Sequence, residues 1–272
     1  MPTKHRAQVK MNAEPKLSQV RRDTAVLRPS ATDDTVPPRI RSATLHPVKG
    51  YDEPSPPQND IGSARDSVPG PFYEPCKRIF DLILGLALLI VATPVILSAA
   101  VFIRLETKGS PFFIQTRLGR HGKSFKIVKL RGMFIDARAR FASYYDYSRH
   151  RDLEFCFHHE EDPRVTRAGR FIRKTSIDEL PNLWNVVLGD MSLVGPRPEI
   201  PEVLALYGPY REEYISVKPG VTCLSKVTGR DRLTKRETIE FDLDYVRRRG
   251  FLLDVKILWK TFRGVLLRRD VF

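Results

Sequence analysis

An uncharged run of 22 residues, 82–103, constrains this chain more than any other stretch. A helix rises ~1.5 Å per residue, so the run is long enough to cross a hydrocarbon core ~30 Å thick. A buried helix of a soluble domain is the alternative. Thr93 and Pro94 stand in the middle of the run, and proline removes a backbone hydrogen bond and clashes with the preceding turn. We therefore expect the helix to kink there.

Basic residues flank both ends of this run. Lys77 and Arg78 precede it, whereas Arg104, Lys108, Arg117 and Arg120 follow it. Because Lys and Arg favour the cytoplasmic side of a membrane, symmetrical flanks favour a helix that enters, bends at Pro94 and leaves by the same face. A straight span with a tolerated proline stays open as the alternative.

The composition divides the chain into three parts. Residues 1–74 hold eleven of the 21 prolines, with mixed charges and no sustained apolar period, and we predict a disordered tail. Residues 75–104 form the predicted re-entrant membrane helix, and residues 105–272 a cytoplasmic domain. The formal net charge of +14, of which +10 lies in residues 79–272, suits an anionic partner: nucleic acid, an acidic bilayer or a phosphorylated substrate.

The cysteines and the position of the first apolar run indicate the cellular compartment. The three cysteines, Cys76, Cys156 and Cys223, are odd in number and widely spaced, which indicates neither a disulfide framework nor a Cys-x-x-Cys metal site. A cleavable signal peptide would place an apolar run within the first ~30 residues, and we expect none here. The default setting is reducing and cytoplasmic.

Apolar spacing after the run predicts an α/β domain that is mainly helical. We expect strands over residues 110–115 and 124–130, joined by a turn at 119–122, and another strand over 221–228. Helices are expected over 136–147, 180–188 with Gly189 as cap, 237–249 and 251–269. The last of these is amphipathic, and either lies on an acidic membrane surface or packs on the globular body.

Charged residues crowd around two adjacent carboxylates, Asp178 and Glu179. Ser176 and Glu179 have the spacing of a capping box, a purely structural interpretation. Pro181 has no N–H to donate, so a helix start nearer Asp178 is the alternative. Either start leaves Asp178 at a helix N-terminus, where free N–H groups and the helix dipole favour anions.

Arginines supply the other half of this constellation. Arg164, Arg167, Arg170 and Arg173 recur at every third residue, and Pro196 and Pro198 restrict the backbone around Arg197. Guanidinium groups bind phosphate oxygens in a bidentate manner, although some of the four arginines are equally explained as a solvated or membrane-facing stripe. Two adjacent acids suit phosphoryl transfer, one as nucleophile and the other holding a divalent metal.

Together these residues resemble the small monotopic bacterial phosphoglycosyl transferases, which start exopolysaccharide or O-antigen assembly on a polyprenol phosphate. The matching motifs, in order, are Lys77-Arg-Ile-Phe-Asp81, Lys126-Ile-Val-Lys-Leu-Arg131, Asp162-Pro-Arg164, Arg173-Lys-Thr-Ser-Ile-Asp-Glu-Leu-Pro181, Asp190-Met-Ser-Leu-Val-Gly-Pro-Arg-Pro-Glu199 and Lys218-Pro-Gly-Val-Thr222. The resemblance implies a UDP-sugar donor, with glucose or galactose favoured, undecaprenyl phosphate as acceptor, Mg2+ as cofactor and release of UMP. It also implies a bacterial inner-membrane location, with the catalytic domain on the cytoplasmic face.

Site roles carried over from the resemblance fall on six residues. Asp178 would be the nucleophile that forms a covalent phosphosugar, and Glu179 a metal ligand. The residues implied to bind substrate phosphate are Arg173, Arg197, Lys129 and Arg131. The break in the membrane helix would be Thr93 and Pro94.

Three positions depart from the family pattern, namely Gly132, Cys223 and Lys226, and they bear on sugar choice and local substrate contacts. A competing interpretation is a non-enzymatic, membrane-tethered basic adaptor that binds acidic lipid or nucleic acid, although no nucleic-acid motif accompanies the charge. A degenerate family member that binds donor without turnover is a third. Membrane lipid is an expected partner, nucleic acid is not, and a homo-oligomer stays open.

Overall fold

The computed structural model describes residues 69–145, 153, 162–229 and 232–267. The tail predicted over residues 1–74 lies outside this part, apart from its last six residues. Of these, Tyr73 and Glu74 already belong to the first helix, α1, which spans Tyr73–Glu106. Helix α1 therefore begins two residues before the predicted start of the membrane helix at residue 75.

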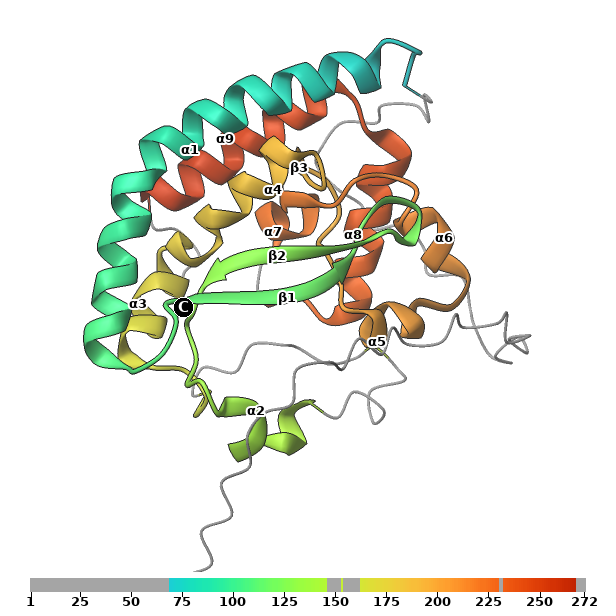
Figure 1. Cartoon of the computed structure of the whole chain (residues 1–272). Helices are drawn as coiled ribbons and strands as arrows, with labels where there is room; N and C mark the ends of the chain where they lie inside the picture. The colour runs from blue at the N-terminus through green and yellow to red at the C-terminus, as the bar shows by residue number, and fades with distance from the viewer. Residues whose placement is uncertain (1–68, 146–152, 154–161, 230–231, 268–272) are drawn as a thin grey trace, which may run out of the picture. The chain divides into compact units, whose positions relative to one another are not determined.

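Helix α1 runs without interruption through Pro94 for 34 residues. The hydroxyl of Thr93 donates to the carbonyl of Leu89 at 2.7 Å, and that of Ser98 donates to the carbonyl of Pro94 at 2.8 Å. These bonds add side-chain donors next to the position where proline supplies none. Figure 1 shows α1 changing direction along its length. The expected kink is thus a bend within one helix, and the chain does not form two separate helices.

One face of α1 is buried and the other is exposed. Its buried residues, three to seven positions apart, are Lys77, Asp81, Gly85, Ala92, Ile96, Ala100 and Ile103. This stripe contacts α4, Leu183–Leu188, and the 3₁₀ helix η4, Ile177–Asn182. A Cβ on Gly85 would lie 3.0 Å from Cγ1 of Val186, so glycine permits the close approach of α1 to α4.

The opposite face of α1 carries a nearly unbroken set of exposed apolar side chains: Ile79, Leu82, Ile83, Leu86, Leu88, Ile90, Val91, Val95, Leu97, Val101, Phe102 and Leu105. Among the described residues, α1 is the one helix long and apolar enough to cross a membrane. The run therefore has features of both a buried helix and a membrane helix. One face joins the protein core, and the other has the apolar surface that lipid requires.

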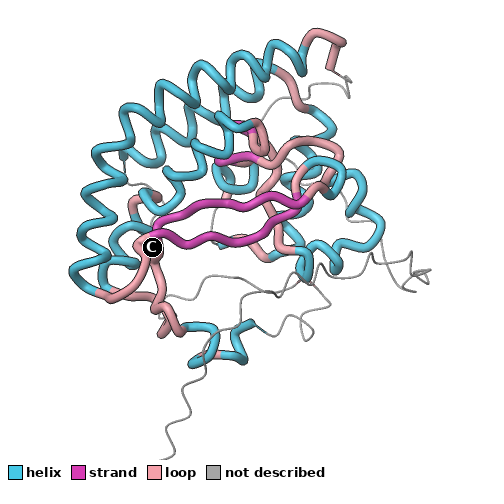
Figure 2. Tube along the Cα trace, in the orientation of Figure 1, coloured by secondary structure: helices cyan, strands magenta, loops and turns pink. Residues whose placement is uncertain are grey.

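The predicted hairpin is confirmed. Strands β1, Phe112–Leu118, and β2, Ser124–Leu130, pair antiparallel with Gln115 opposite Ile127, and the turn η1, Arg120–Gly122, joins them. A second, short pair joins β3, Ser192–Val194, and β4, Gly220–Thr222, in parallel. Figure 2 shows the β1–β2 hairpin at the front, with helices above it and to its sides.

The strand predicted over residues 221–228 is wrong beyond Thr222. The chain turns at Cys223 into the helix α7, Leu224–Thr228. Its partner β3 is only three residues long, so no ladder is available for a longer strand. As a helix, the segment places Leu224 and Val227 against the core instead.

The remaining helices follow the prediction only in part, because those over 167–174 and 201–214 were not predicted. The helix expected over 136–147 is two short turns in its described part, α2, Ala137–Arg140, and η2, Ala142–Tyr145. Helix α3 spans Arg167–Lys174, and the short helices α5, Pro201–Leu204, η5, Ala205–Tyr210, and α6, Arg211–Tyr214, follow β3. Helix α8, Lys235–Arg248, begins at a capping box between Thr234 and Glu237.

Helix α9, Phe251–Leu267, packs on the globular body, as one of its two predicted descriptions has it, and its placement on a membrane surface stays a prediction. Asp254 and Ile257 are buried against the body, whereas Phe251, Leu252, Val255, Trp259, Phe262 and Val265 are exposed. Figure 1 shows α9 lying along α1, and the rings of Phe80 and Phe251 meet edge to face at 5.2 Å. The two helices therefore both present apolar surface outside the core.

Candidate active site

The adjacent carboxylates lie in a 3₁₀ turn between two helices. Ser176 has a left-handed backbone, with φ of 57°, and so ends α3 and starts η4. Its side chain makes no capping bond, so the predicted capping box is wrong, although Ser176 does precede η4 and Asp178 lies in its first turn. Because Pro181 cannot donate a backbone hydrogen bond, regular α-helix begins only at Leu183, and Gly189 ends it as predicted.

Two lysines from distant segments hold Glu179. Nζ of Lys129, on β2, lies 2.9 Å from Oε1 of Glu179, and Nζ of Lys226, on α7, bonds to Oε2. Burial would raise the pKa of Glu179, but Lys129, Lys226 and then Arg197 outweigh it and hold that pKa well below its usual range. Glu179 is thus a permanent anion between two cations.

Asp178 is shifted in the opposite direction. Burial and the neighbouring charge of Glu179 raise its pKa to about 6, against the opposing effect of Lys129, Lys226 and Arg173. When the pKa values of two adjacent carboxyl groups are shifted in opposite directions, one group stays ionised and the other can gain or lose a proton. Asp178 is the one that changes its charge near neutral pH.

A pocket opens beside Glu179 and is markedly basic. It is lined by Arg117, Ile127, Lys129, Glu179, Asn182, Arg197, Pro198, Gly220, Val221, Cys223 and Lys226. Four cations face one carboxylate in this set, so the pocket favours an anionic ligand.

The backbone of Arg197 is fixed by residues that sequence reasoning missed. Its N–H donates to Oδ2 of Asp242 at 2.9 Å, and its carbonyl accepts from the hydroxyl of Tyr214 at 2.9 Å. Tyr214 also donates to Oδ2 of Asp242. Asp242 lies on the buried face of α8, between Ile239 and Val246. The available signal in the sequence was an acidic residue on the apolar face of a predicted helix. A buried carboxylate needs hydrogen-bond donors, so its position indicates that another segment supplies them.

Arg173 approaches Asp178 from α3. A Cβ on Gly132 would lie 3.2 Å from Cδ of Arg173, and one on Gly169 only 1.8 Å from the carbonyl oxygen of Gly132. Both glycines therefore let α3 and the arginine stem press against the chain after β2. Nη1 of Arg173 lies 4.0 Å from Oδ2 of Asp162. The departure at Gly132 thus makes room for a predicted site arginine.

Two other predicted arginines serve the fold. Arg131 is buried, and its guanidinium donates to the carbonyls of Thr107 and Lys108 after α1, so the structure does not bring it to the pocket. Arg164 is also buried and forms a bidentate pair with Asp162. The remaining two of the four recurring arginines, Arg167 and Arg170, are exposed on α3.

The other departures lie at the pocket itself. Lys226 supplies one of the two ammonium groups on Glu179, a role that its spacing from Glu179 in the sequence does not reveal. Cys223 is buried beside Ser225, and burial raises the pKa of its thiol to about 12, with Asp242 adding to the rise. Cys223 is therefore a neutral lining group and not a nucleophile at neutral pH.

The family model described as "Bacterial sugar transferase" matches residues 72–268. The chain belongs to the bacterial sugar transferase family. It is 34% identical over 204 residues to the exopolysaccharide production protein ExoY of Sinorhizobium fredii, covering 72% of this chain and 88% of that relative. The range matched by the family model spans the positions of the carboxylates, the two lysines and Arg197.

Two longer relatives have more specific names. The chain is 39% identical over 196 residues to a UDP-galactose-lipid carrier transferase of Erwinia amylovora, covering 71% of this chain and 41% of the relative. It is 37% identical over 209 residues to an undecaprenyl-phosphate glucose phosphotransferase of Komagataeibacter xylinus, covering 72% of this chain and 37% of the relative. The sugar transferase chain thus spans about two fifths of the length of these relatives.

Proposed function

We propose that this sugar transferase moves a sugar 1-phosphate from a UDP-sugar to undecaprenyl phosphate, as the first step of exopolysaccharide or related glycan assembly. One observation carries the proposal: Glu179 lines a basic pocket, and the pKa of the neighbouring Asp178 is shifted in the opposite direction to that of Glu179. The names of the relatives supply the substrate classes, since they specify UDP-galactose, glucose and undecaprenyl phosphate.

Asp178 acts as the nucleophile in this proposal. Its ionised carboxylate attacks the β-phosphorus of the UDP-sugar, the bond from that phosphorus to the bridging oxygen breaks, and UMP departs with the electron pair. A phosphate oxygen of undecaprenyl phosphate then attacks the same phosphorus and frees the Asp178 carboxylate. Ionisation above about pH 6 makes the group available for attack at neutral pH.

The cationic side chains around Asp178 are suited to the negative charge that develops on the phosphoryl oxygens. Lys129, Lys226 and Arg197 line the pocket, and Arg173 acts electrostatically on Asp178. Phosphoryl transfer depends mainly on positioning and on fixed positive charge, because the equatorial oxygens carry the negative charge of the transition state. Each of these side chains would orient the diphosphate and neutralise part of it.

Mg2+ is part of this proposal. Within the described residues no three His, Cys, Asp or Glu side chains gather into a metal cage. Mg2+ commonly uses one or two carboxylates together with substrate phosphates and water, so the Asp178 and Glu179 pair fits it. The buried Oδ1 of Asn182 lines the same pocket and has no hydrogen-bond partner among the described residues, which adds an oxygen donor. The ion would neutralise the diphosphate when bound.

Glu179 can hold that ion only by releasing a lysine. Both of its carboxylate oxygens already accept from ammonium groups, those of Lys129 and Lys226. Either lysine is long enough to turn toward a substrate phosphate instead. The lysines would therefore pass from the carboxylate to the diphosphate as the metal and donor enter.

Substitution of Asp178 tests the reaction. Membranes containing the full chain or Asp178→Asn are incubated with undecaprenyl phosphate and either UDP-glucose or UDP-galactose, and UMP release is measured. We expect the variant to retain membrane association and to lose transfer, by about 10⁴-fold or more for a removed nucleophile. A radiolabelled phosphosugar should stay on the wild-type protein and be absent from the variant. Full turnover by Asp178→Asn would rule out Asp178 as the nucleophile, whereas absence of transfer by the wild type would favour the adaptor interpretation.

A re-entrant α1, with the catalytic domain on the cytoplasmic face of the inner membrane, completes the proposal. Cys76 is exposed near the start of α1, so it reports the side of the membrane on which that end lies. An impermeant thiol reagent applied to intact cells should leave Cys76 unlabelled and should label it after permeabilisation. A Cys76→Ser variant is the control, and labelling of Cys76 in intact cells would exclude this topology.

A further inference from the structure

A second pocket opens at the start of α1 and shares no lining residue with the carboxylate site. It is formed by Tyr73, Glu74, Lys77, Arg78, Asp81, Arg120, Ser192, Val194, Val217, Lys218, Tyr245 and Arg249. These residues come from α1, η1, β3, α8 and the segment before β4. Its volume is about 200 Å3, which is smaller than the usual sites for drug-sized molecules and suits a small ligand group.

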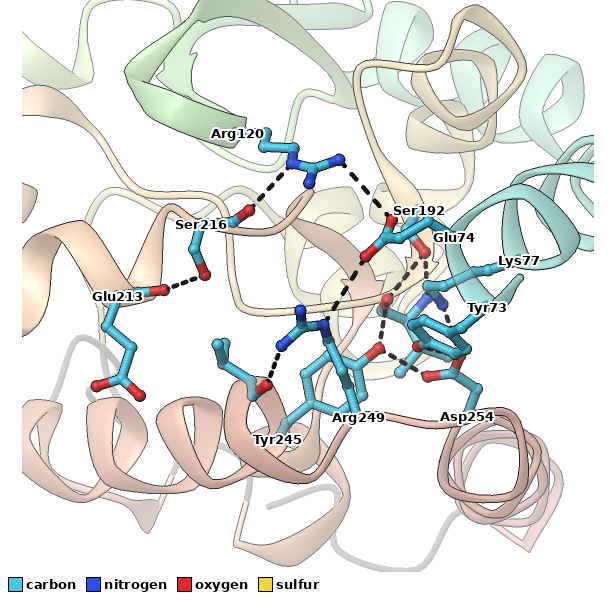
Figure 3. Close-up of polar contacts among 12 residues, drawn as sticks. Tyr73, Glu74, Lys77, Arg120, Ser192, Glu213, Ser216, Tyr245, Arg249 and Asp254 are labelled. Carbon is cyan, nitrogen blue, oxygen red and sulfur yellow. Dashed lines mark hydrogen bonds and ion pairs between the residues drawn. The ribbon is translucent and has the colours of Figure 1, made fainter. Parts of the chain in front are cut away.

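Five cations line this pocket, and backbone carbonyls hold three of them in place. Arg78 donates to the carbonyls of Val186 and Val187 at 2.7 and 2.9 Å, and Arg120 donates to that of Ser216 at 3.0 Å. Arg249 donates to the carbonyl of Val246 (Figure 3). A carbonyl fixes a guanidinium without cancelling its charge, so the positive charge is both positioned and retained.

Carboxylates neutralise this charge incompletely. Figure 3 shows Glu74 between Arg120 and Arg249, and it lies 3.8 Å from each, beyond hydrogen-bond distance. Nζ of Lys77 is paired with the buried Asp254 at 2.8 Å. Even with Asp254 counted, three carboxylates, including Asp81, oppose five cations.

Lys218 is the least satisfied of these cations. It makes no hydrogen bond or ion pair within the part of the chain that the structure describes. Burial, with Arg78 and Arg120 nearby, lowers its pKa, as expected for an ammonium group that lacks a partner among like charges. An incoming anion would supply that partner.

The pocket also adjoins the exposed apolar surface. Its lining residues occupy the first turns of α1, and Ile79 and Leu82 on the same turns are exposed. Phe251 and Leu252 at the start of α9 are exposed as well, and Phe251 meets α1 through Phe80. In a membrane the headgroup phosphates lie directly beside the acyl chains, so a cationic pocket next to an apolar surface suits such a phosphate.

We propose that this pocket binds a phosphate-bearing anion at a site separate from the carboxylate site. Arg120, Arg249 and Lys218 would contact its oxygens, because guanidinium groups bind phosphate in bidentate fashion and the lysine ammonium serves as a point charge. The ligand is either the phosphate of an anionic membrane lipid or a free phosphate. Binding would clamp the start of α1 to β3 and α8 and does not depend on the proposed transfer reaction.

Thermal unfolding of the purified full chain in non-ionic detergent tests the site. Short-chain phosphatidylglycerol, short-chain phosphatidylcholine and inorganic phosphate are titrated separately against the wild type, Lys218→Gln, Arg120→Gln and the control Lys123→Gln. Lys123 is exposed in the same hairpin turn and does not line the pocket, so its loss matches the change in charge. Lys218→Gln removes no hydrogen bond or ion pair of the folded chain, and its unliganded midpoint should not fall below that of the wild type, because the buried charge costs stability.

We expect phosphatidylglycerol to raise the unfolding midpoint of the wild type and of Lys123→Gln at the same concentration. Lys218→Gln and Arg120→Gln should each need roughly fivefold more lipid. The same dependence with inorganic phosphate would identify the free anion as sufficient, and dependence with phosphatidylglycerol alone would identify the lipid headgroup. The proposal would be overturned if the unfolding midpoints of all four proteins responded equally, or if the wild type responded to neither phosphate source. It would also be overturned if phosphatidylcholine raised the midpoint as much as phosphatidylglycerol does.

Discussion

Neutralising the two adjacent carboxylates should change stability in opposite directions. In Asp178 the pKa is raised from its ordinary value of 3.8 to about 6, so the folded chain disfavours the ionised form that is present at neutral pH. A difference of one pH unit corresponds to about 1.36 kcal/mol, which gives a cost of about 3 kcal/mol above pH 6. Asp178→Asn removes the charge and should recover most of that free energy.

Glu179→Gln should do the reverse. Its pKa is held well below the usual range by Lys129, Lys226 and Arg197, against the effect of burial, so its charge stabilises the fold. Removing that charge leaves two largely buried ammonium groups without their anion, which costs about 3 kcal/mol or more. At about 2–4 °C per kcal/mol for a chain of this size, the two variants should differ by more than 10 °C in unfolding midpoint.

The pH dependence separates this explanation from a general effect of mutation. Because the folded-state pKa of Asp178 is raised, the folded chain binds the proton more tightly than the unfolded chain between about pH 4 and pH 6. The stability gain of Asp178→Asn should therefore be complete above pH 6 and decline as pH falls toward 4. Midpoints measured by differential scanning calorimetry from pH 4.5 to 8 decide this. A loss of stability in Asp178→Asn at pH 7.5, or a gain that is independent of pH, would refute the reasoning.

Three further predictions rest on other contacts. Lys226→Gln removes a cation that lowers the pKa of Asp178. When the rate of UMP release is plotted against pH, its acidic limb should therefore move to higher pH by about one unit, and an unmoved limb would contradict this. Asp254→Asn leaves the buried Lys77 without its carboxylate and should lower the free energy of unfolding by about 3–5 kcal/mol, measured by chemical denaturation; a change below 1 kcal/mol would be inconsistent with the buried pair. Gly169→Ala places a Cβ 1.8 Å from a backbone oxygen and should prevent soluble expression of folded chain; a normal unfolding midpoint would show that the backbone can separate there.

Several elements were predictable because their cause is local. The 22 uncharged residues form a helix, the two apolar segments around residues 119–122 form a hairpin, and Gly189 ends α4 with a positive φ of 91°. Each depends on backbone preferences or on apolar spacing within one segment. The Asp178 and Glu179 pair and Arg197 were also identified from short motifs, with Lys129 among the basic candidates.

Long-range contacts decided what the sequence left open. Residues 224–228 became a helix because β3 offers only three residues to pair with. Lys226 reaches Glu179 across 47 positions, and Asp242 holds Arg197 across 45. Arg131 and Arg164 have the same chemistry as Arg197 but lie against carbonyls and a carboxylate of the fold. Residue type alone does not distinguish these uses.

The sequence by itself therefore determined the long apolar helix, the hairpin, the carboxylate motif and the family. Only the tertiary structure decided which of the two carboxyl groups stays ionised and which exchanges a proton. The pKa values of Asp178 and Glu179 depend on burial and on lysines from β2 and α7. The tertiary structure also decided that one face of α1 is core and the other is free for lipid. Electrostatic energy falls with distance and with access to water, and both are properties of the folded chain.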